Sequence, residues 1–217
     1  MPAHRDPLGD ATRRVAEGGL VAYPTETVWG LAADARSEAG LEALRSWKGR
    51  DAGQPISVLV DAVAALEDYG FESDGCAATL AKKFWPGPLT LVLRCRTAFA
   101  RGVAREDGAV GVRCSAHPLA AAWSRRLRAE GAGPVTATSL NRAGTRAART
   151  RREAETLCVR GPVGCESVSL LAVEGAEAGG DTPSTVLDLT EAEPRVLRRG
   201  SIPETELLSA IEEIRSR

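Results

Sequence analysis

The sequence contains no apolar run long enough to cross a membrane. The apolar stretches at Ile56 to Val60 and Leu89 to Leu93 are far shorter than the roughly 18 residues that a bilayer requires. The first ten residues carry one histidine, one arginine and two aspartates around no apolar core, so no secretory or transit signal is visible. These absences predict a cytoplasmic protein without membrane contact.

Cysteine and histidine are too sparse for a metal-binding or disulfide framework. The five cysteines are widely scattered and never form a Cys-x-x-Cys pair, which predicts free thiols. The only histidines are His4 and His117. Cys114 and His117 form an isolated pair, so we expect a structural or surface role for His117 and no zinc site.

The usual nucleotide-binding signatures are also missing. There is neither a Gly-x-x-x-x-Gly-Lys-Ser/Thr phosphate loop nor a Gly-x-Gly-x-x-Gly turn. Lysine occurs only at Lys48, Lys82 and Lys83, and arginine supplies the other positive charges. The formal net charge of −1 gives no overall attraction to nucleic acid. Any nucleotide site must therefore be built locally from other residues.

What is present predicts one α/β domain over residues 1–217. The chain has 217 residues, 43% of them hydrophobic and 26% charged, which is typical of globular proteins. Apolar spacing alternates between strand and helix periods, so we expect a mixed sheet. Strands are expected at 20–22, 56–60, 89–94, 110–113, 135–138, 168–173, 185–189 and 196–198, and helices ending near 17 and at 37–47, 63–69 (with Asp61 as cap), 75–85, 119–130 and the C-terminus.

Polar residues gather where expected strands end, the usual place for ligands in open α/β sheets. Lys48 and Arg50 lie two residues apart, so an extended backbone would project both cations to one side and allow them to grip a polyphosphate. Gly49 between them would allow close approach of a ligand. Alone, the tripeptide is weak evidence, and a solvated basic turn is the better interpretation of it.

Three further segments combine small polar side chains in the same way. Ser139 and Asn141 present a hydroxyl and an amide just after an apolar strand, which suits phosphate or sugar oxygens, although a turn or cap would use the same groups. The segments Pro24 to Thr27 and Pro183 to Thr185 each join a rigid proline to hydroxyls and could be simple loops.

Together these segments form a pattern that resembles the YrdC-like family. The pattern covers roughly Asp10 to Leu208 in the family's order, and the joint occurrence of seven motifs is far more specific than any one of them. The motifs are Tyr23 to Leu31, Lys48 to Arg50, Phe84 to Thr90, Val112-Arg113, Ser139 to Asn141, Pro183 to Val186 and Val196 to Arg198.

The resemblance implies a short, single-domain YrdC-like α/β fold. In that fold a twisted, largely curled mixed sheet with flanking helices surrounds a positively charged cavity. It also implies a threonylcarbamoyl-AMP synthase, a nucleotidyltransferase that converts L-threonine, bicarbonate and ATP to threonylcarbamoyl-AMP and pyrophosphate. The product would pass to a tRNA threonylcarbamoyl transferase, and Mg²⁺ would bridge the ATP phosphates.

Carried over by motif, Lys48 and Arg50 would be catalytic and bind ATP by stabilising developing negative charge. Ser139 and Asn141 would contact the phosphates, and Arg198 would help to hold ATP.

The resemblance assigns threonine to Thr25, Arg113 and Ser184. Arg113 is the strongest of these physically, because guanidinium offers two parallel donors to a carboxylate. A structural ion pair is the alternative for Arg113.

Two other functions are open at this point. Arginines at 142, 146, 149, 151 and 152 suggest a non-catalytic module for double-stranded RNA, or a contact with tRNA, but only 4% of residues are aromatic and no aromatics alternate with these arginines. A related carbamoyl-transferring enzyme would need further domains and metal motifs that are not found here.

Overall fold

The computed structural model describes residues 6–50, 53–73, 75–162 and 164–216, along which helices and strands alternate. The helices are α1 (Pro7–Ala16), α2 (Glu38–Lys48), α3 (Ala65–Asp68), α4 (Gly75–Phe84), α5 (Pro118–Ala129), α6 (Arg151–Val159) and α7 (Glu204–Arg215). The strands are β1 (Leu20–Tyr23), β2 (Gly30–Ala32), β3 (Val58–Val60), β4 (Leu89–Arg94), β5 (Ala109–Cys114), β6 (Val135–Thr136), β7 (Thr138–Ser139), β8 (Val168–Leu170), β9 (Thr185–Asp188) and β10 (Arg195–Arg198).

The expected α/β alternation is confirmed, with local corrections. The strand expected at 135–138 is interrupted at Ala137 and becomes β6 and β7. Asp61 does not cap α3, which starts after Ala64 without a side-chain cap; instead an Asp61 carboxylate oxygen lies 3.4 Å from a nitrogen of Arg128. Strand β2 and helix α6 were not expected from the apolar spacing.

The strands form two mixed sheets and no closed barrel among the described residues. The smaller sheet has the order β7-β2-β1-β8, and the larger has the order β10-β9-β4-β5-β3-β6. Parallel pairs join β1 to β8, β3 to β5 and β4 to β9, while the other pairs are antiparallel. Because β6 and β7 are separated only by Ala137, the chain passes there directly from the larger sheet to the smaller one.

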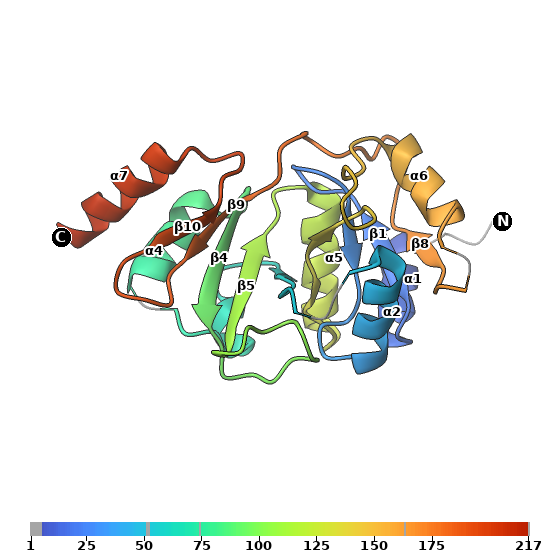
Figure 1. Cartoon of the computed structure of the whole chain (residues 1–217), viewed down its shortest axis with the longest axis horizontal. Coiled ribbons are helices and arrows are strands. Elements are labelled where there is room, and N and C mark those ends of the chain that lie inside the picture. The colour runs from blue at the N-terminus through green and yellow to red at the C-terminus, as the bar shows by residue number, and fades with distance from the viewer. Residues whose placement is uncertain (1–5, 51–52, 74, 163, 217) are drawn as a thin grey trace.

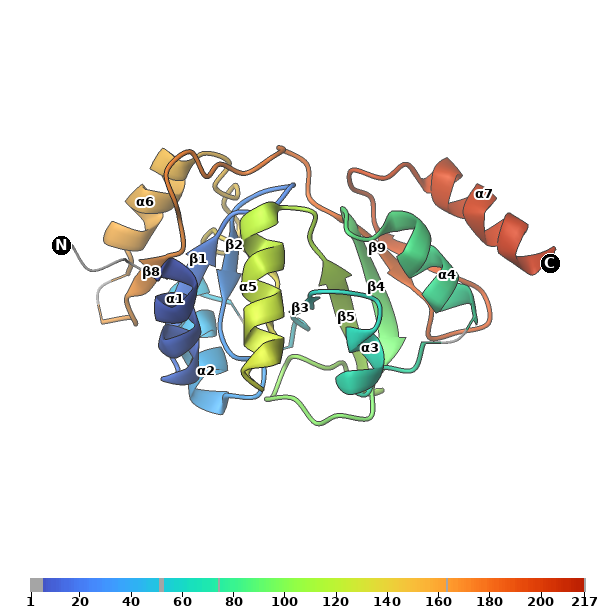
Figure 2. The same cartoon turned by 180° about the vertical axis from the view of Figure 1, so that it is seen from behind.

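The two sheets lie at opposite ends of the long axis of the molecule. Figure 1 shows α1, α2 and α6 around the smaller sheet, and α4 and α7 beside the larger one. From behind, α5 lies over the middle of the molecule (Figure 2). In both views the connection from β8 to β9 runs along one edge from the smaller sheet to the larger. The space between the sheets is therefore bounded by strand-end loops of both.

Two groups of buried apolar side chains hold these layers together. The larger one includes Trp29, Trp47 and residues of both sheets. The smaller one lies beneath α1 and α5, where the rings of Tyr23 and Trp123 meet edge to face with centroids 5.5 Å apart. Aromatic pairs in this geometry add to the hydrophobic stabilisation from buried area.

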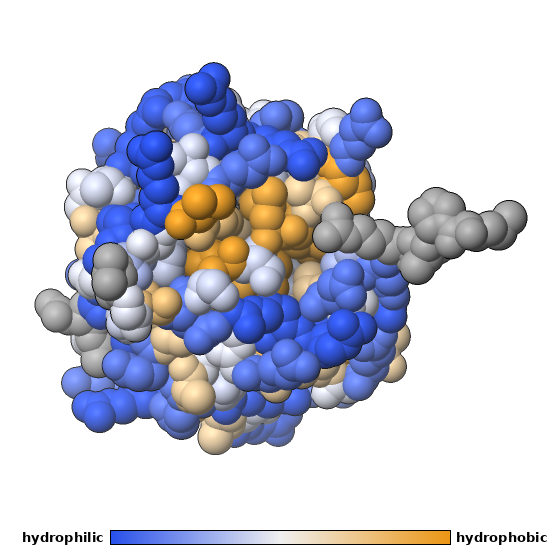
Figure 3. Space-filling model, turned by 90° about the vertical axis from the view of Figure 1, so that its right-hand side faces the viewer, coloured by the Kyte–Doolittle hydropathy of each residue, from blue (hydrophilic) through white to orange (hydrophobic). Residues whose placement is uncertain are grey.

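The face at the N-terminal end of the molecule carries apolar side chains on its surface. Figure 3 shows a group of apolar side chains there within a polar rim. Val159 of α6 is 86% exposed, and a cavity of about 220 Å³ lies between α1 and β8. Strand β8 ends its sheet, so its outer edge pairs with no other described strand. No helix in the described part of the chain combines the length and apolarity needed to span a membrane.

Candidate functional site

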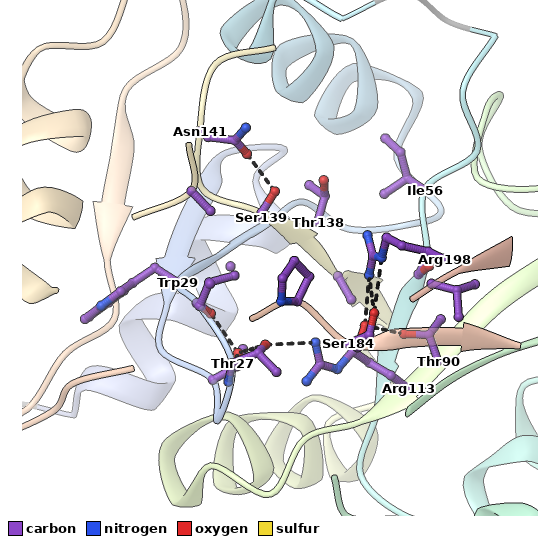
Figure 4. Close-up of a pocket in the computed structure, with 18 of the residues that line it drawn as sticks. Thr27, Trp29, Ile56, Thr90, Arg113, Thr138, Ser139, Asn141, Ser184 and Arg198 are labelled. Carbon is purple, nitrogen blue, oxygen red and sulfur yellow. Dashed lines mark hydrogen bonds between the residues drawn. The ribbon is translucent and has the colours of Figure 1, made fainter. Parts of the chain in front are cut away.

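A cavity of about 330 Å³ collects the polar motifs that are far apart in the sequence. Its lining comes from strand ends and loops of both sheets (Figure 4). Of the residues predicted from the sequence, all but Lys48 line it: Thr25, Arg50, Arg113, Ser139, Asn141, Ser184 and Arg198. Polar segments that were expected to meet at strand ends therefore line one cavity.

The Ser139 to Asn141 segment forms one wall through its own hydrogen bonds. The Ser139 hydroxyl donates to Asn141 Oδ1 at 2.6 Å, as expected for side chains two residues apart. Asn141 Nδ2 donates to the carbonyls of Arg142 at 3.0 Å and Thr145 at 2.7 Å. The amide thus folds the following turn, while both side chains remain in the lining.

Lys48 supports this wall from behind. It is only 3% exposed, and its ammonium donates to the carbonyls of Ser139 at 2.5 Å and Asn141 at 3.0 Å. A third bond, at 3.1 Å, reaches Asn141 Oδ1. Three acceptors match the three donors of an ammonium group. Lys48 therefore joins the end of α2 to the Ser139 to Asn141 segment.

The expected extended backbone at Lys48 to Arg50 is wrong. Helix α2 continues through Lys48, and Gly49 ends it in the left-handed conformation with φ of 63°. The amide of Gly49 donates to the carbonyl of Ser46 at 3.2 Å, and the amide of Arg50 to that of Arg45 at 3.2 Å, as in a glycine-terminated helix. This turn separates the two cations, so that Lys48 is buried and Arg50 faces the cavity.

Burial gives Lys48 an unusual proton affinity. Loss of solvation, together with the positive charges of Arg50 and Arg142, lowers the pKa of Lys48 from 10.5 to about 7. The unfolded state therefore binds more protons than the folded state between these two values. By linkage, this group makes the protein more stable as pH rises from about 7 towards 10.

We expect Lys48→Met to abolish this contribution. The free energy of unfolding of the wild type, minus that of the variant, should increase with pH by up to about 1.4 kcal/mol per unit between pH 7.5 and 9.5. Urea unfolding at several pH values measures it. A difference that stays constant over this range would contradict the lowered pKa.

Arg50 brings to the cavity a cation that no described carboxylate neutralises. No residue in the described segments accepts a hydrogen bond from its guanidinium, and its Nε is buried without a partner. Burial lowers the pKa of Arg50, and the charge of Arg45 lowers it further. Arg50 is half-buried, and a partly desolvated cation without a partner among the described residues is stabilised when an anion joins it, so this position favours binding of a negatively charged group.

Arg113 lies at the other end of the cavity, on β5, and meets a carboxylate of the protein. Its Nη2 lies 2.6 Å from Glu26 Oε1, and its Nη1 donates to the Thr27 hydroxyl at 3.3 Å. Ser115 donates to the other oxygen of Glu26. The ion pair that we considered as an alternative is therefore present, and Arg113 also lines the cavity. Glu26 was not predicted from the sequence as a site residue, although it is the one acidic residue of its motif.

Thr25 and Thr27 organise the loop between β1 and β2. The Thr25 hydroxyl donates to the carbonyl of Val28 at 2.7 Å and accepts from the amide of Thr27 at 3.1 Å. Its oxygen lies 2.9 Å from that of Thr27. Thr25 is thus largely engaged in holding the loop, whereas Thr27, which the sequence analysis did not select, points towards Arg113 (Figure 4).

Arg198 and Ser184 form a further cluster at the ends of β10 and β9. Arg198 donates to the Ser184 carbonyl at 2.9 and 3.1 Å and to its hydroxyl at 3.0 Å. The Ser184 hydroxyl also lies 2.9 Å from that of Thr90 in β4, a residue the sequence analysis missed. Burial lowers the pKa of Arg198, and Arg113 and Arg50 lower it further. The positive charge of Arg198 therefore interacts with those of both other arginines around the cavity.

Comparison with known proteins places this geometry in a family. A family model described as telomere recombination, covering the Sua5, YciO and YrdC proteins, matches residues 13–200. The chain belongs to the Sua5, YciO and YrdC family.

Several members of the Sua5, YciO and YrdC family are closely similar over most of this chain. A threonylcarbamoyl-AMP synthase of Pyrococcus abyssi is 36% identical over 201 residues, covering 93% of this chain and 56% of the relative. A threonylcarbamoyl-AMP synthase of Chromohalobacter salexigens is 35% identical over 200 residues, covering 92% and 100%. The crystal structure of P. abyssi Sua5 complexed with L-threonine superposes with a TM-score of 0.82 at 32% identity, covering 97% of this chain and 59% of that one. The chain thus spans little more than half the length of some relatives and the whole length of another.

The arginine-rich segment of this family member does not form a free basic stripe. Arg146 lies 2.7 Å from Glu153, Arg151 lies 2.8 Å from Glu155, and Arg149 pairs with Asp181. The first two partners lie on α6, which starts at a Thr150 and Glu153 capping box. Local carboxylates therefore offset much of this charge, which disfavours the RNA-binding module considered from the sequence.

Metal-ligand geometry is absent from the described part of this family member. No group of three or more His, Cys, Asp or Glu side chains there could hold an ion. The described cavity lining contains no carboxylate, because Glu26 lies behind Arg113 and outside the lining. The donor set of the cavity consists of guanidinium, hydroxyl and amide groups, which suits anions better than cations.

Proposed function

We propose that this protein is a threonylcarbamoyl-AMP synthase. The observation that carries the proposal is the convergence of Arg50, Arg113 and Arg198, from three separate elements, on one cavity without a lining carboxylate. Such a cavity would be positively charged and would suit ATP together with an amino-acid carboxylate. The names of similar family members support this assignment.

The cavity provides two ends with different chemistry. We assign the ATP phosphates to the end with Arg50, Ser139 and Asn141, and Arg198 to the nucleotide beside them. Lys48 contributes by fixing the positions of Ser139 and Asn141, with which it forms three hydrogen bonds.

Threonine would occupy the end with Arg113, Thr27 and Ser184. In this arrangement Arg113 faces the amino-acid carboxylate and Ser184 lies near the side chain, while Thr25 shapes the loop. A guanidinium that already holds Glu26 on Nη2 still has free N–H groups for a second carboxylate.

The reaction needs placement and charge stabilisation more than a protein nucleophile. The threonine amine combines with bicarbonate to give an N-carboxy group and water. An oxygen of this carboxylate attacks the α-phosphorus of ATP, and the bond to the β-phosphate oxygen breaks to release pyrophosphate. Arg50 stabilises the negative charge on the phosphoryl oxygens, and Arg113 holds the amino acid in line for attack. Charge stabilisation and positioning are the largest catalytic effects in phosphoryl transfer.

Magnesium enters in this proposal with the substrate. ATP would bind as its magnesium complex, and the cavity would receive the phosphate oxygens that the ion leaves free. The product, a mixed anhydride of a carbamate and AMP, is a donor for an enzyme that transfers the threonylcarbamoyl group to tRNA.

Pyrophosphate release by purified protein tests the proposal. We expect release from ATP only when threonine and bicarbonate are both present, with threonylcarbamoyl-AMP detected by mass spectrometry. Omitting either substrate should reduce the rate to background. Release that is independent of threonine, or none under any condition, would contradict the assignment.

A further inference from the structure

The connection from β8 to β9 touches the loop that carries Glu26. Within it, residues 174–181, here called the strap, pass over the backbone of residues 25–27. The amide of Gly179 donates to the carbonyl of Thr25 at 2.9 Å. Figures 1 and 2 show this connection crossing from one sheet to the other along the edge of the molecule. The strap is therefore joined to the threonine end of the cavity by its main chain.

Two consecutive glycines make this contact close. A methyl group at Gly179 would lie 3.1 Å from Cα of Glu26 and 3.2 Å from its carbonyl oxygen. At Gly180 it would lie 3.0 Å from the Glu26 carbonyl oxygen and 3.3 Å from that of Thr27. Neither glycine has a positive φ, so the requirement for glycine here is steric and not conformational. Any side chain at these positions must push the strap and the loop apart.

Both flanks of the strap are anchored independently of this contact. His117, at the start of α5, accepts the Leu119 amide on Nδ1 at 3.2 Å, which leaves Nε2–H to donate to the Glu177 carbonyl at 3.0 Å. On the opposite side the amide of Arg151 donates to a carboxylate oxygen of Glu177 at 2.7 Å, and Arg149 pairs with Asp181. These contacts hold the strap against the loop.

The loop beneath the strap determines the position of Arg113. The carboxylate of Glu26 holds Nη2 of Arg113, and the hydroxyl of Thr27 accepts from Nη1. The side chains of Arg113 and Glu26 are only 9% and 18% exposed, so water contributes little to their placement. A shift of the backbone at residues 26–27 would therefore move both partners of this guanidinium together.

We propose that the strap is a positioning element for the amino-acid end of the cavity. Gly179 and Gly180, pressed on the Glu26 and Thr27 backbone and anchored by His117, fix the direction in which Arg113 faces the substrate carboxylate. The inference rests on the proposed function, because it takes threonine as the ligand of Arg113. It assigns Gly179, Gly180 and His117 a role that neither contact with substrate nor the sequence motifs provide.

Kinetics of Gly180→Ala provide the first test. We expect the KM for threonine to rise about tenfold, because displacements of tenths of an ångström in a binding group are costly, while the KM for ATP stays within about twofold. Gly75→Ala at the start of α4 is the matched control, since a methyl group there meets no atom within 4 Å. It should leave both constants unchanged. Wild-type KM for threonine in Gly180→Ala, or equal changes in both constants, would overturn the proposal.

His117→Asn tests the anchor without adding bulk. Asparagine preserves the cap of α5 but cannot reach the Glu177 carbonyl as the imidazole does. Loss of this one hydrogen bond should raise the KM for threonine about fivefold and leave that for ATP unchanged. Equal circular dichroism spectra of variant and wild type would show that α5 persists.

Hydrogen exchange gives a readout that a merely structural strap would not change. Addition of L-threonine to the full chain should slow exchange of the Gly179 amide, because the ligand fixes the loop that accepts this hydrogen bond, whereas ATP alone should not. Unchanged exchange with saturating threonine would overturn the strap's role. A wild type that releases no pyrophosphate would instead refute the proposed function, so the two failures are distinguishable.

Discussion

Replacing Arg50 with alanine should reduce kcat for pyrophosphate release by about two to three orders of magnitude, which corresponds to roughly 3–4 kcal/mol of lost transition-state stabilisation. The guanidinium lines the cavity and has no acceptor within the described residues, and its Nε is buried. Its positive charge can therefore stabilise the ATP phosphates in the proposed reaction, including the negative charge that develops on them in the transition state. Because removal of Arg50 breaks no described side-chain hydrogen bond, we expect the fold to persist.

Single-turnover measurements with Arg50→Ala and Arg50→Lys would separate charge from geometry. Lysine should restore part of the rate, because it supplies charge without the paired donors of a guanidinium. Arg13→Ala is a suitable control, since the Arg13 side chain is 67% exposed on α1 and, among the described residues, pairs only with Asp10 at 3.3 Å. It should retain full activity. A wild-type rate in Arg50→Ala would contradict the proposed phosphate contact.

Arg113→Gln should weaken threonine binding about a hundredfold while changing ATP binding less than about threefold. A buried, charge-assisted contact with a carboxylate contributes roughly 3 kcal/mol, and the other two arginines of the described lining, Arg50 and Arg198, are assigned to the nucleotide. Calorimetric titration with threonine, and separately with ATP, measures the two affinities. Equal weakening of both would assign Arg113 a shared structural role.

The buried ion pair with Glu26 requires a second variant in this experiment. Loss of Arg113 alone leaves the Glu26 carboxylate unpaired, which could destabilise the fold by about 3–5 kcal/mol. The double variant Arg113→Gln with Glu26→Gln removes both charges and can retain a neutral hydrogen bond. We expect it to regain stability but not threonine binding. Recovery of threonine binding in the double variant would show that the Arg113 charge is not needed.

The position of the cavity could be predicted because polar residues at the ends of apolar strands converge wherever strand ends meet. Ser139 ends β7, Ser184 immediately precedes β9 and Arg198 ends β10, and each lines the cavity. The strand period thus indicates which ends carry ligands without knowledge of the sheet order. Sheet order itself depends on pairings over more than a hundred residues, such as β1 with β8, for which local spacing gives no signal.

The role of Lys48 could not be predicted because it depends on where a helix ends. The sequence shows two cations around a glycine, which suits either an extended segment or a helix terminus. In the structure Gly49 adopts the left-handed conformation and ends the helix, so that Lys48 belongs to its last turn and points inwards. The division of the strand at Ala137 is likewise a tertiary effect, since its amide donates to the carbonyl of Ser57 at 2.6 Å.

Helix α6 and the contact of Glu26 with Arg113 were not predicted from the sequence, for two different reasons. Thr150 and Glu153 form a capping box, and this sequence signal was present although the apolar spacing after it is weak. Glu26 had no local signal, because its importance arises only when β5 brings Arg113 beside the β1–β2 loop.

The choice of guanidinium over amine in the cavity has a consequence for carbon dioxide chemistry. A neutral amine adds carbon dioxide to form a carbamate, and bicarbonate solutions always contain some of that gas. No lysine is among the described lining residues, and Lys48 is 3% exposed, with its nitrogen within hydrogen-bond distance of three oxygens. Arginine does not undergo this addition under such conditions. In the proposed reaction, the amino group of the substrate is then the only amine in the described cavity that can be carboxylated, and no lysine of the described lining competes with it for carbon dioxide.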